Sequence, residues 1–192
     1  MTTTPAWLLA PCLIATATPA HANFAQIKHV ELLSARLLAS NSATATLETW
    51  CAEFGISDAG KITAKRLDDA PRPISDEQRQ RLAIGAGEAV AYRKVALMCG
   101  AVTLSIAENW YVPARLTPAI NASLSGDTPF GRAIVALRPE RVTLSTLLLW
   151  NPAGGAPAPD HVLEHRALVL GGDGVPLAEV VEHYTKDILR RP

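Results

Sequence analysis

Apolar residues along this chain repeat with two different periods, one helical and one typical of strands. In residues 24–39 they recur every three or four positions, among them Val30, Leu33 and Leu37, which predicts an amphipathic helix. Capping residues and small-residue breakers predict shorter helices at residues 46–54, 76–82 and 117–124, and a helix start near residue 129.

Strand patterns dominate the second half of the chain. They predict strands at residues 89–99, 102–112, 142–150, 161–170 and 176–184, and a weaker one at 61–67. Gly100-Ala101 and the glycine-rich run 171–174 join two pairs of these strands as hairpins. The sequence therefore predicts an α+β fold, with an antiparallel sheet of about six strands and helices packed on one face. One domain over residues 23–192 accounts for this length.

Charge and short motifs exclude several classes of function. Eighteen basic and 18 acidic residues give a formal net charge of zero, without the basic face that a nucleic-acid partner requires. Neither GxGxxG nor GxxxxGK[ST] occurs, and GxSxG is missing too. No histidine stands at metal-ligand spacing to a cysteine, so we expect neither a metal nor a cofactor.

The first 22 residues differ from the rest. No charged side chain precedes Lys28, residues 6–17 are apolar, and the small-x-small sequence Ala20-His21-Ala22 is a shape that signal peptidases cleave. The stretch is too short and too interrupted by proline for a membrane span. It predicts a leader that directs the protein to the periplasm or the outside; the alternative is an Ala/Thr/Pro tail on a cytoplasmic protein.

Three cysteines remain, Cys12, Cys51 and Cys99, and none belongs to a CxxC motif. We favour two buried free thiols at Cys51 and Cys99. If Cys12 leaves with a signal peptide, the other two can instead pair in an oxidising compartment.

Strand alternation places two charged residues among apolar ones. Arg93 shares a face with Val95 and Leu97, and Glu182 shares a face with Val180 and Tyr184. A buried guanidinium needs a carboxylate partner or an anionic ligand. Two readings stay open, a structural ion pair between Arg93 and Glu182 or a binding site for an anion. The other face of the last strand, with Glu179 and His183, is expected to meet solvent.

The same residues occur in an order that resembles a known family. Residues 93–99 (RKVALMC), 128–132 (TPFGR) and 174–177 (GVPL), followed by Glu182, are similar to the motifs of chorismate pyruvate-lyase. The resemblance covers residues 89–185, about half the chain. It implies the chorismate lyase-like fold, in which a small carboxylate binds between the sheet and its covering helices.

The resemblance also implies an activity and a set of site residues. Such a lyase releases pyruvate from chorismate and leaves 4-hydroxybenzoate, a quinone precursor, without metal or cofactor. Arg93 and the Phe130 amide would hold the carboxylate, and Glu182 would accept the ring hydroxyl, with Arg93 and Glu182 as the catalytic pair. Gly131, Asn109 and Arg166 are the further expected substrate contacts.

A second class of function shares this fold. The chorismate lyase-like fold also serves as the effector-sensing domain of some transcription regulators, so a non-catalytic ligand-binding module is the alternative to an enzyme. No helix-turn-helix segment accompanies the domain here. Export would separate the protein from chorismate, a cytosolic metabolite. In either case we expect a monomer with a small-molecule ligand.

Overall fold

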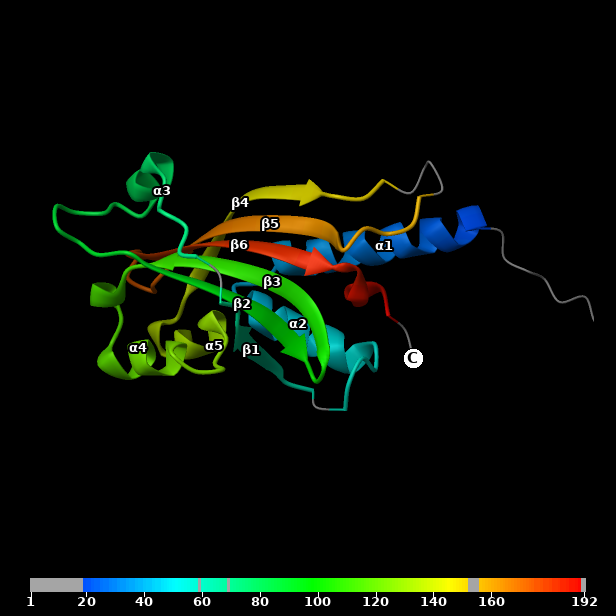
Figure 1. Cartoon of the computed structure of the whole chain (residues 1–192), viewed down its shortest axis with the longest axis horizontal. Helices are drawn as coiled ribbons and strands as arrows, with labels where there is room; N and C mark the ends of the chain where they lie inside the picture. Colours follow the sequence, from blue (N-terminus) through cyan, green and yellow to red (C-terminus); the bar gives the residue numbers. More distant parts are fainter. Residues whose placement is uncertain (1–18, 59, 69, 152–155, 191–192) are drawn as a thin grey trace, which may run out of the picture.

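One antiparallel sheet organises the fold. The computed structural model describes residues 19–58, 60–68, 70–151 and 156–190. In these residues the sheet has six strands, in the order β1-β2-β3-β6-β5-β4, and every neighbouring pair is antiparallel (Figure 1). The strands are β1 (Ile62–Arg66), β2 (Ala91–Cys99), β3 (Val102–Tyr111), β4 (Glu140–Leu148), β5 (His161–Leu170) and β6 (Pro176–Thr185).

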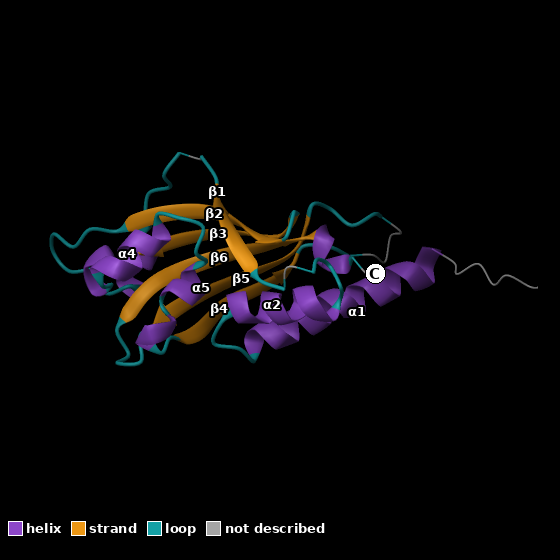
Figure 2. Cartoon of the chain, turned by 90° about the horizontal axis from the view of Figure 1, so that it is seen from below, coloured by secondary structure: helices purple, strands orange, loops and turns teal. Residues whose placement is uncertain are grey.

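Helices cover one face of this sheet. They are α1 (Pro19–Leu38), α2 (Ala43–Glu53), α4 (Pro118–Leu124) and α5 (Phe130–Ala133), which lie together in front of the strands in Figure 2. Short 3-10 turns stand at Pro113–Arg115, Val135–Leu137 and Lys186–Leu189. The predicted α+β class, with an antiparallel sheet of about six strands under helices, is confirmed.

Local signals explain where the helices begin. Ser42 caps α2 by accepting a hydrogen bond from the backbone N–H of Ala45, so this helix starts at Ala43, three residues before the predicted start. Ser75 and Gln78 form a reciprocal capping box at α3 (Asp76–Arg81).

Two apolar clusters fill the space under the helices. The larger one packs α1 and α2 against the sheet around Leu33, Trp50 and Tyr184. The smaller one packs α4 and α5 around Leu124 and Ile134. Between them lies the part of the sheet that carries the polar residues predicted for the site.

The opposite face of the sheet is partly covered as well. The segment around α3 packs Leu82 against Trp110 and Val181 there. Glu179 is therefore fully buried, with Arg81 donating to both of its carboxylate oxygens at 2.7 and 3.0 Å. The prediction that Glu179 faces solvent is wrong, because strand alternation assigns a side chain to a face but does not show what covers that face.

Cys51 and Cys99 form a disulfide that ties α2 to the end of β2. The preference for two free thiols is therefore wrong. α2 lies directly over the sheet, and this brings the two Cα atoms to 6.1 Å, within the range that a disulfide spans. Cys12 lies outside the described residues.

The predicted leader can be compared with the structure only at its end. Residues 1–18 lie outside the described part, and α1 begins at Pro19, so the predicted cleavage point after Ala22 falls within this helix. Across residues 19–190, as far as they are described, no helix combines the length and the apolar character needed to cross a membrane.

Candidate functional site

Three adjacent strands bring the predicted site residues to the helix-covered face. Arg93 on β2 is the Cα partner of Asn109 on β3, and Asn109 in turn faces Val180 on β6. Glu182 lies two residues further along β6, opposite Ala107. The predicted faces of Arg93 and Glu182 are thus confirmed, and both side chains are buried.

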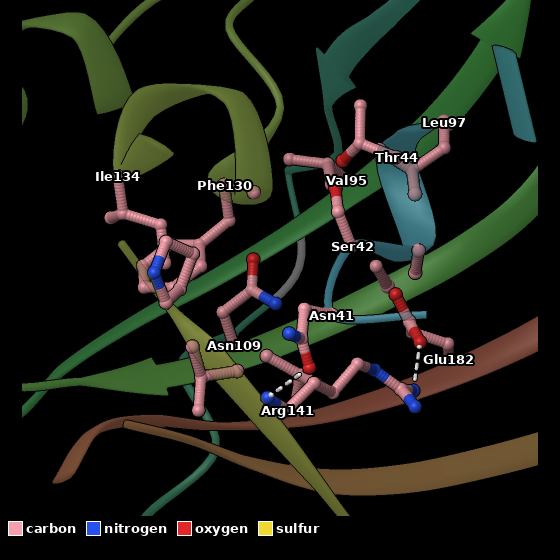
Figure 3. Close-up of a pocket in the computed structure, with 16 residues that line it drawn as sticks. Asn41, Ser42, Thr44, Val95, Leu97, Asn109, Phe130, Ile134, Arg141 and Glu182 are labelled. Carbon is pink, nitrogen blue, oxygen red and sulfur yellow. Dashed lines mark hydrogen bonds and ion pairs between the residues drawn. The ribbon is translucent and has the colours of Figure 1, made fainter. Parts of the chain in front are cut away.

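A cavity opens between this face and the starts of α2 and α5 (Figure 3). The centre of a water-sized sphere can move within about 40 Å³ of this cavity. The whole space free of atoms, including the open mouth, is about 490 Å³. Its polar lining comes from the sheet, from the loop before α2 and from the first turn of α2. These polar residues are Asn41, Ser42, Thr44, Asn109, Arg141 and Glu182.

Glu182 has two partners at the cavity wall. The Arg141 guanidinium donates to its Oε2 at 2.7 Å, and the Tyr184 hydroxyl donates to the same oxygen at 2.9 Å. The side chains of Arg141 and Glu182 are only 3% and 8% exposed. Burial alone lowers the pKa of Arg141, but attraction to Glu182 and Tyr184 outweighs it and raises the pKa above its usual value. One open prediction was an ion pair between Arg93 and Glu182. Glu182 instead forms its ion pair with Arg141.

Arg93 has no carboxylate partner among the residues the structure describes. One nitrogen, Nη2, donates to the carbonyl oxygens of Gly126 and Thr128 at 2.9 and 3.0 Å. Its Nε and Nη1 are buried without a hydrogen-bond partner in that part of the chain. Burial, and then repulsion from Arg66, lower the pKa of Arg93. Attraction from Asp127 offsets this lowering only in part, so no carboxylate in direct contact compensates the buried guanidinium.

Asn109 connects Arg93 to the cavity. Its side chain points into the open space below Phe130 and Ile134 (Figure 3). Its Oδ1 is buried and has no hydrogen-bond partner in the described chain. Arg93 itself does not line the cavity; it lies beside Asn109, its cross-strand partner, on the neighbouring strand β2.

Phe130 and Gly131 close the cavity from the side of α5. A Cβ at Gly131 would lie 3.0 Å from Thr44 Oγ1 and 3.2 Å from Ser42 Oγ, so glycine permits the close approach of α5 to the start of α2. The predicted turn at residues 128–132 therefore sits at the cavity, as the resemblance implied, and it faces residues of α2 that the sequence did not single out.

The ionised side chains that line this cavity, taken together with Arg93 beside it, sum to one positive charge. They are two guanidinium groups, Arg93 and Arg141, and one carboxylate, Glu182. His165, the Cα partner of Glu182 on β5, adds no charge at neutral pH, because burial and then Arg141 lower its pKa to about 4. The site thus has the charge that suits a single anionic group.

Arg166 is the one predicted contact that lies elsewhere. It sits on the opposite face of β5, where its Nη1 is 3.5 Å from Glu179 Oε1. A ligand in the cavity cannot reach it through the sheet. The structure thus brings Glu182, Asn109, Phe130 and Gly131 together, places Arg93 beside Asn109, and separates Arg166 from the group. The roles of all six residues stay predictions.

Arg141 is the functional candidate that sequence reasoning missed. The predicted strand started at residue 142, whereas β4 starts at Glu140 and carries Arg141 on the cavity face opposite Val169. A bulge between Thr143 and Ser145 breaks the alternation along β4, so no regular pattern pointed to this arginine.

These features define the class of the protein: an α+β domain with a partly closed, largely apolar cavity that carries a few polar side chains, between an antiparallel sheet and its helices. No family model matches the chain. It is 38% identical over 180 residues to the uncharacterized protein y4mC of Sinorhizobium fredii (strain NBRC 101917 / NGR234), a match that covers 85% of this chain and 76% of y4mC. The chain therefore belongs to the family of y4mC.

Solved structures with a similar course of the chain include three bacterial proteins. A possible transcriptional regulator, YydK of Bacillus subtilis, has 17% identity and a TM-score of 0.45, with coverage of 68% of this chain and 61% of YydK. The ligand-binding domain of a putative GntR-family transcriptional regulator from Bordetella bronchiseptica has 14% identity and a TM-score of 0.46, with coverage of 67% of this chain and 85% of that domain. The effector domain of PhnF from Mycobacterium smegmatis has 14% identity and a TM-score of 0.48, with coverage of 66% of this chain and 82% of that domain. Likeness at this level does not say what the chain binds.

Proposed function

We propose that this protein binds a small monocarboxylate, of the class of 4-hydroxybenzoate, in the cavity between the sheet and α5. One observation carries the proposal: beside Asn109, which lines the cavity, Arg93 has two buried N–H donors that lack an acceptor. Buried polar groups are nearly always satisfied, so an unsatisfied set at a cavity wall points to a ligand.

The charge of the site supports a monoanion over a dianion. With Arg141 neutralised by Glu182, Arg93 remains as the uncompensated charge. A carboxylate beside Asn109 would compensate it at short range in a poorly solvated environment, where such attraction is strong. The ring of an aromatic acid would then lie against Phe130, Ile134 and Val180, which line the same space. The closed part of the cavity is small, so such a ring would occupy its mouth or displace lining side chains.

Chorismate pyruvate-lyase activity is the second candidate. It is supported by Glu182, Phe130 and Gly131 lining one cavity, as the resemblance implies. Against it, the carboxylate of Glu182 is already held by Arg141 and Tyr184, and chorismate carries two carboxylates where the site has one excess positive charge. Ligand binding without turnover therefore fits the geometry better.

The disulfide supports a site of action outside the cytosol. Disulfides persist in oxidising compartments and are rare in the cytosol. Together with the leader-like residues 1–22, the Cys51–Cys99 bond favours export, which would also keep the protein away from cytosolic chorismate. The mass of the mature N-terminus tests this; a chain that keeps Met1 or Thr2 and two reactive thiols would contradict export.

Thermal unfolding with 4-hydroxybenzoate tests the binding proposal. Ligand at one hundred times its dissociation constant should stabilise the wild-type protein by about 2.7 kcal/mol, a rise in Tm of roughly 5–10 °C. Arg93→Met should abolish this shift, because it removes the uncompensated charge while filling a similar volume. Arg166→Met is the matched control on the opposite face and should keep it. An equal shift in Arg93→Met and wild type would remove Arg93 from the site.

Incubation with chorismate, followed by the absorbance of 4-hydroxybenzoate, tests the second candidate. If the lyase reading holds, product forms and Glu182→Gln slows its formation, whereas Glu164→Gln on the neighbouring strand does not. Binding of 4-hydroxybenzoate without any turnover would leave the binding function alone.

A further inference from the structure

The strand at one edge of the sheet carries an unusual number of exposed apolar side chains. β4 is paired on one side only, with β5, throughout the described part of the chain. Five aliphatic residues on it or just after it are 37% to 51% exposed: Val142, Leu144, Leu147, Leu148 and Leu149. A free strand edge offers unpaired backbone N–H and C=O groups to another strand, and apolar side chains on it favour such pairing.

The other edge of the same sheet lacks this character. β1 is five residues long, and its exposed side chains are Thr63, Lys65 and Arg66. Short length and lysine are the usual means by which proteins protect a strand edge. The exposed apolar side chains are thus a feature of the β4 edge and not of both edges of this sheet.

The apolar surface continues from β4 onto α1. Leu148 and Thr146 line a groove of about 230 Å³ together with Ala35 and Leu38 of α1, and Leu38 is 55% exposed. Leu147 points to the other face of the sheet, beside its cross-strand partner Glu164. The strand thus presents apolar side chains on both faces, as a strand does inside a continuous sheet.

We propose that this edge joins two copies of the chain, with β4 of each copy paired antiparallel to β4 of the other. A twofold axis perpendicular to the sheet makes the surface complementary to itself, because Leu147 of both copies then lies on one face and Leu38 and Leu148 of both copies lie on the other. The two α1 helices meet over the seam. The formal net charge of zero adds no long-range repulsion between copies.

The size of the patch fits such a dimer. The six exposed aliphatic residues on β4 and at the end of α1 present on the order of 500 Å². A standard interface buries about 800 Å² on each partner, of which roughly 60% is apolar, or about 480 Å². The proposal replaces the monomer expected from the sequence, and it does not depend on what the cavity binds.

Light scattering on the eluted full-length protein tests this dimer. Wild type should elute with twice the mass of one chain at about 50 μM, and Leu147→Lys/Leu149→Lys should elute as a monomer with an unchanged circular dichroism spectrum. Val175→Lys is the matched control: Val175 is 39% exposed like the β4 residues but stands in the β5–β6 turn, so this variant should stay dimeric.

Hydrogen exchange gives a second measurement on the same samples. Amides of residues 144–149 should exchange more slowly in the dimer than in the double variant, while those of β1 exchange alike in both. A wild-type chain that is monomeric at this concentration overturns the proposal. A dimer that survives the double substitution overturns the location of the interface.

Discussion

Replacing Glu182 by glutamine should destabilise the protein strongly, whatever the cavity binds. The change keeps the size of the side chain and its acceptor for the Tyr184 hydroxyl, but it leaves the Arg141 guanidinium, 3% exposed, without a carboxylate. Breaking a buried ion pair from one side costs about 3–5 kcal/mol. Because Tyr184 keeps its hydrogen bond, we expect about 3 kcal/mol, or a fall in Tm of roughly 6–12 °C for a domain of this size.

Urea denaturation followed by tryptophan fluorescence measures this loss, since Trp50 and Trp150 are buried. Glu164→Gln is the matched control, because that carboxylate is more exposed and its partner, at 2.9 Å, is His183; it should cost less than about 1 kcal/mol. Arg141→Met combined with Glu182→Gln should cost clearly less than the two single changes added together, because no charge is then left unpaired. If Glu182→Gln were as mild as the control, the buried pair would not exist in solution.

Three further predictions concern other parts of the molecule. The pKa of His165 is lowered to about 4, below its unfolded value of about 6.5, so the unfolded chain binds a proton first. Wild type should therefore lose about 1.6 kcal/mol between pH 6.5 and pH 5 that His165→Gln does not lose; parallel curves would contradict the depressed pKa. Reducing the Cys51–Cys99 bond, which closes a separation of 48 residues, should cost about 4 kcal/mol, and unchanged urea midpoints with and without reductant would refute its contribution. Gly131→Ala should cost about 1–2 kcal/mol and weaken ligand binding because its Cβ crowds the start of α2, whereas Gly126→Ala, whose Cβ meets its nearest atom at 3.8 Å, should change ligand binding little.

Much of the sheet was predictable because alternation and turn residues are local signals. The hairpins and the faces of Arg93 and Glu182 follow from strand periodicity and the glycines between the strands. The caps of α3 and α4 were equally readable, since each depends on residues within one turn of the helix.

The missed features all depend on contacts between segments distant in sequence. Glu179 is buried because Arg81, 98 positions earlier, packs across it. Arg141 binds Glu182, which lies 41 positions later in the sequence. A bulge in β4 interrupts the alternation of side chains, so the face that Arg141 joins could not be predicted from the sequence pattern. The disulfide likewise depends on where α2 lies on the sheet. Local patterns predict which elements form and which face a side chain joins, but partners across the core become visible only when the elements are packed.

Calorimetric titration tests the central claim, that the cavity binds one small carboxylate, most directly. The wild-type protein should bind 4-hydroxybenzoate at one site per chain, and at least about tenfold, or 1.4 kcal/mol, more tightly than the uncharged 4-hydroxybenzamide. Asn109→Leu should abolish the binding of the acid while the protein stays folded. Equal affinity for acid and amide, or binding unaffected by Asn109→Leu, would show that the charge of Arg93 beside Asn109 does not select the ligand.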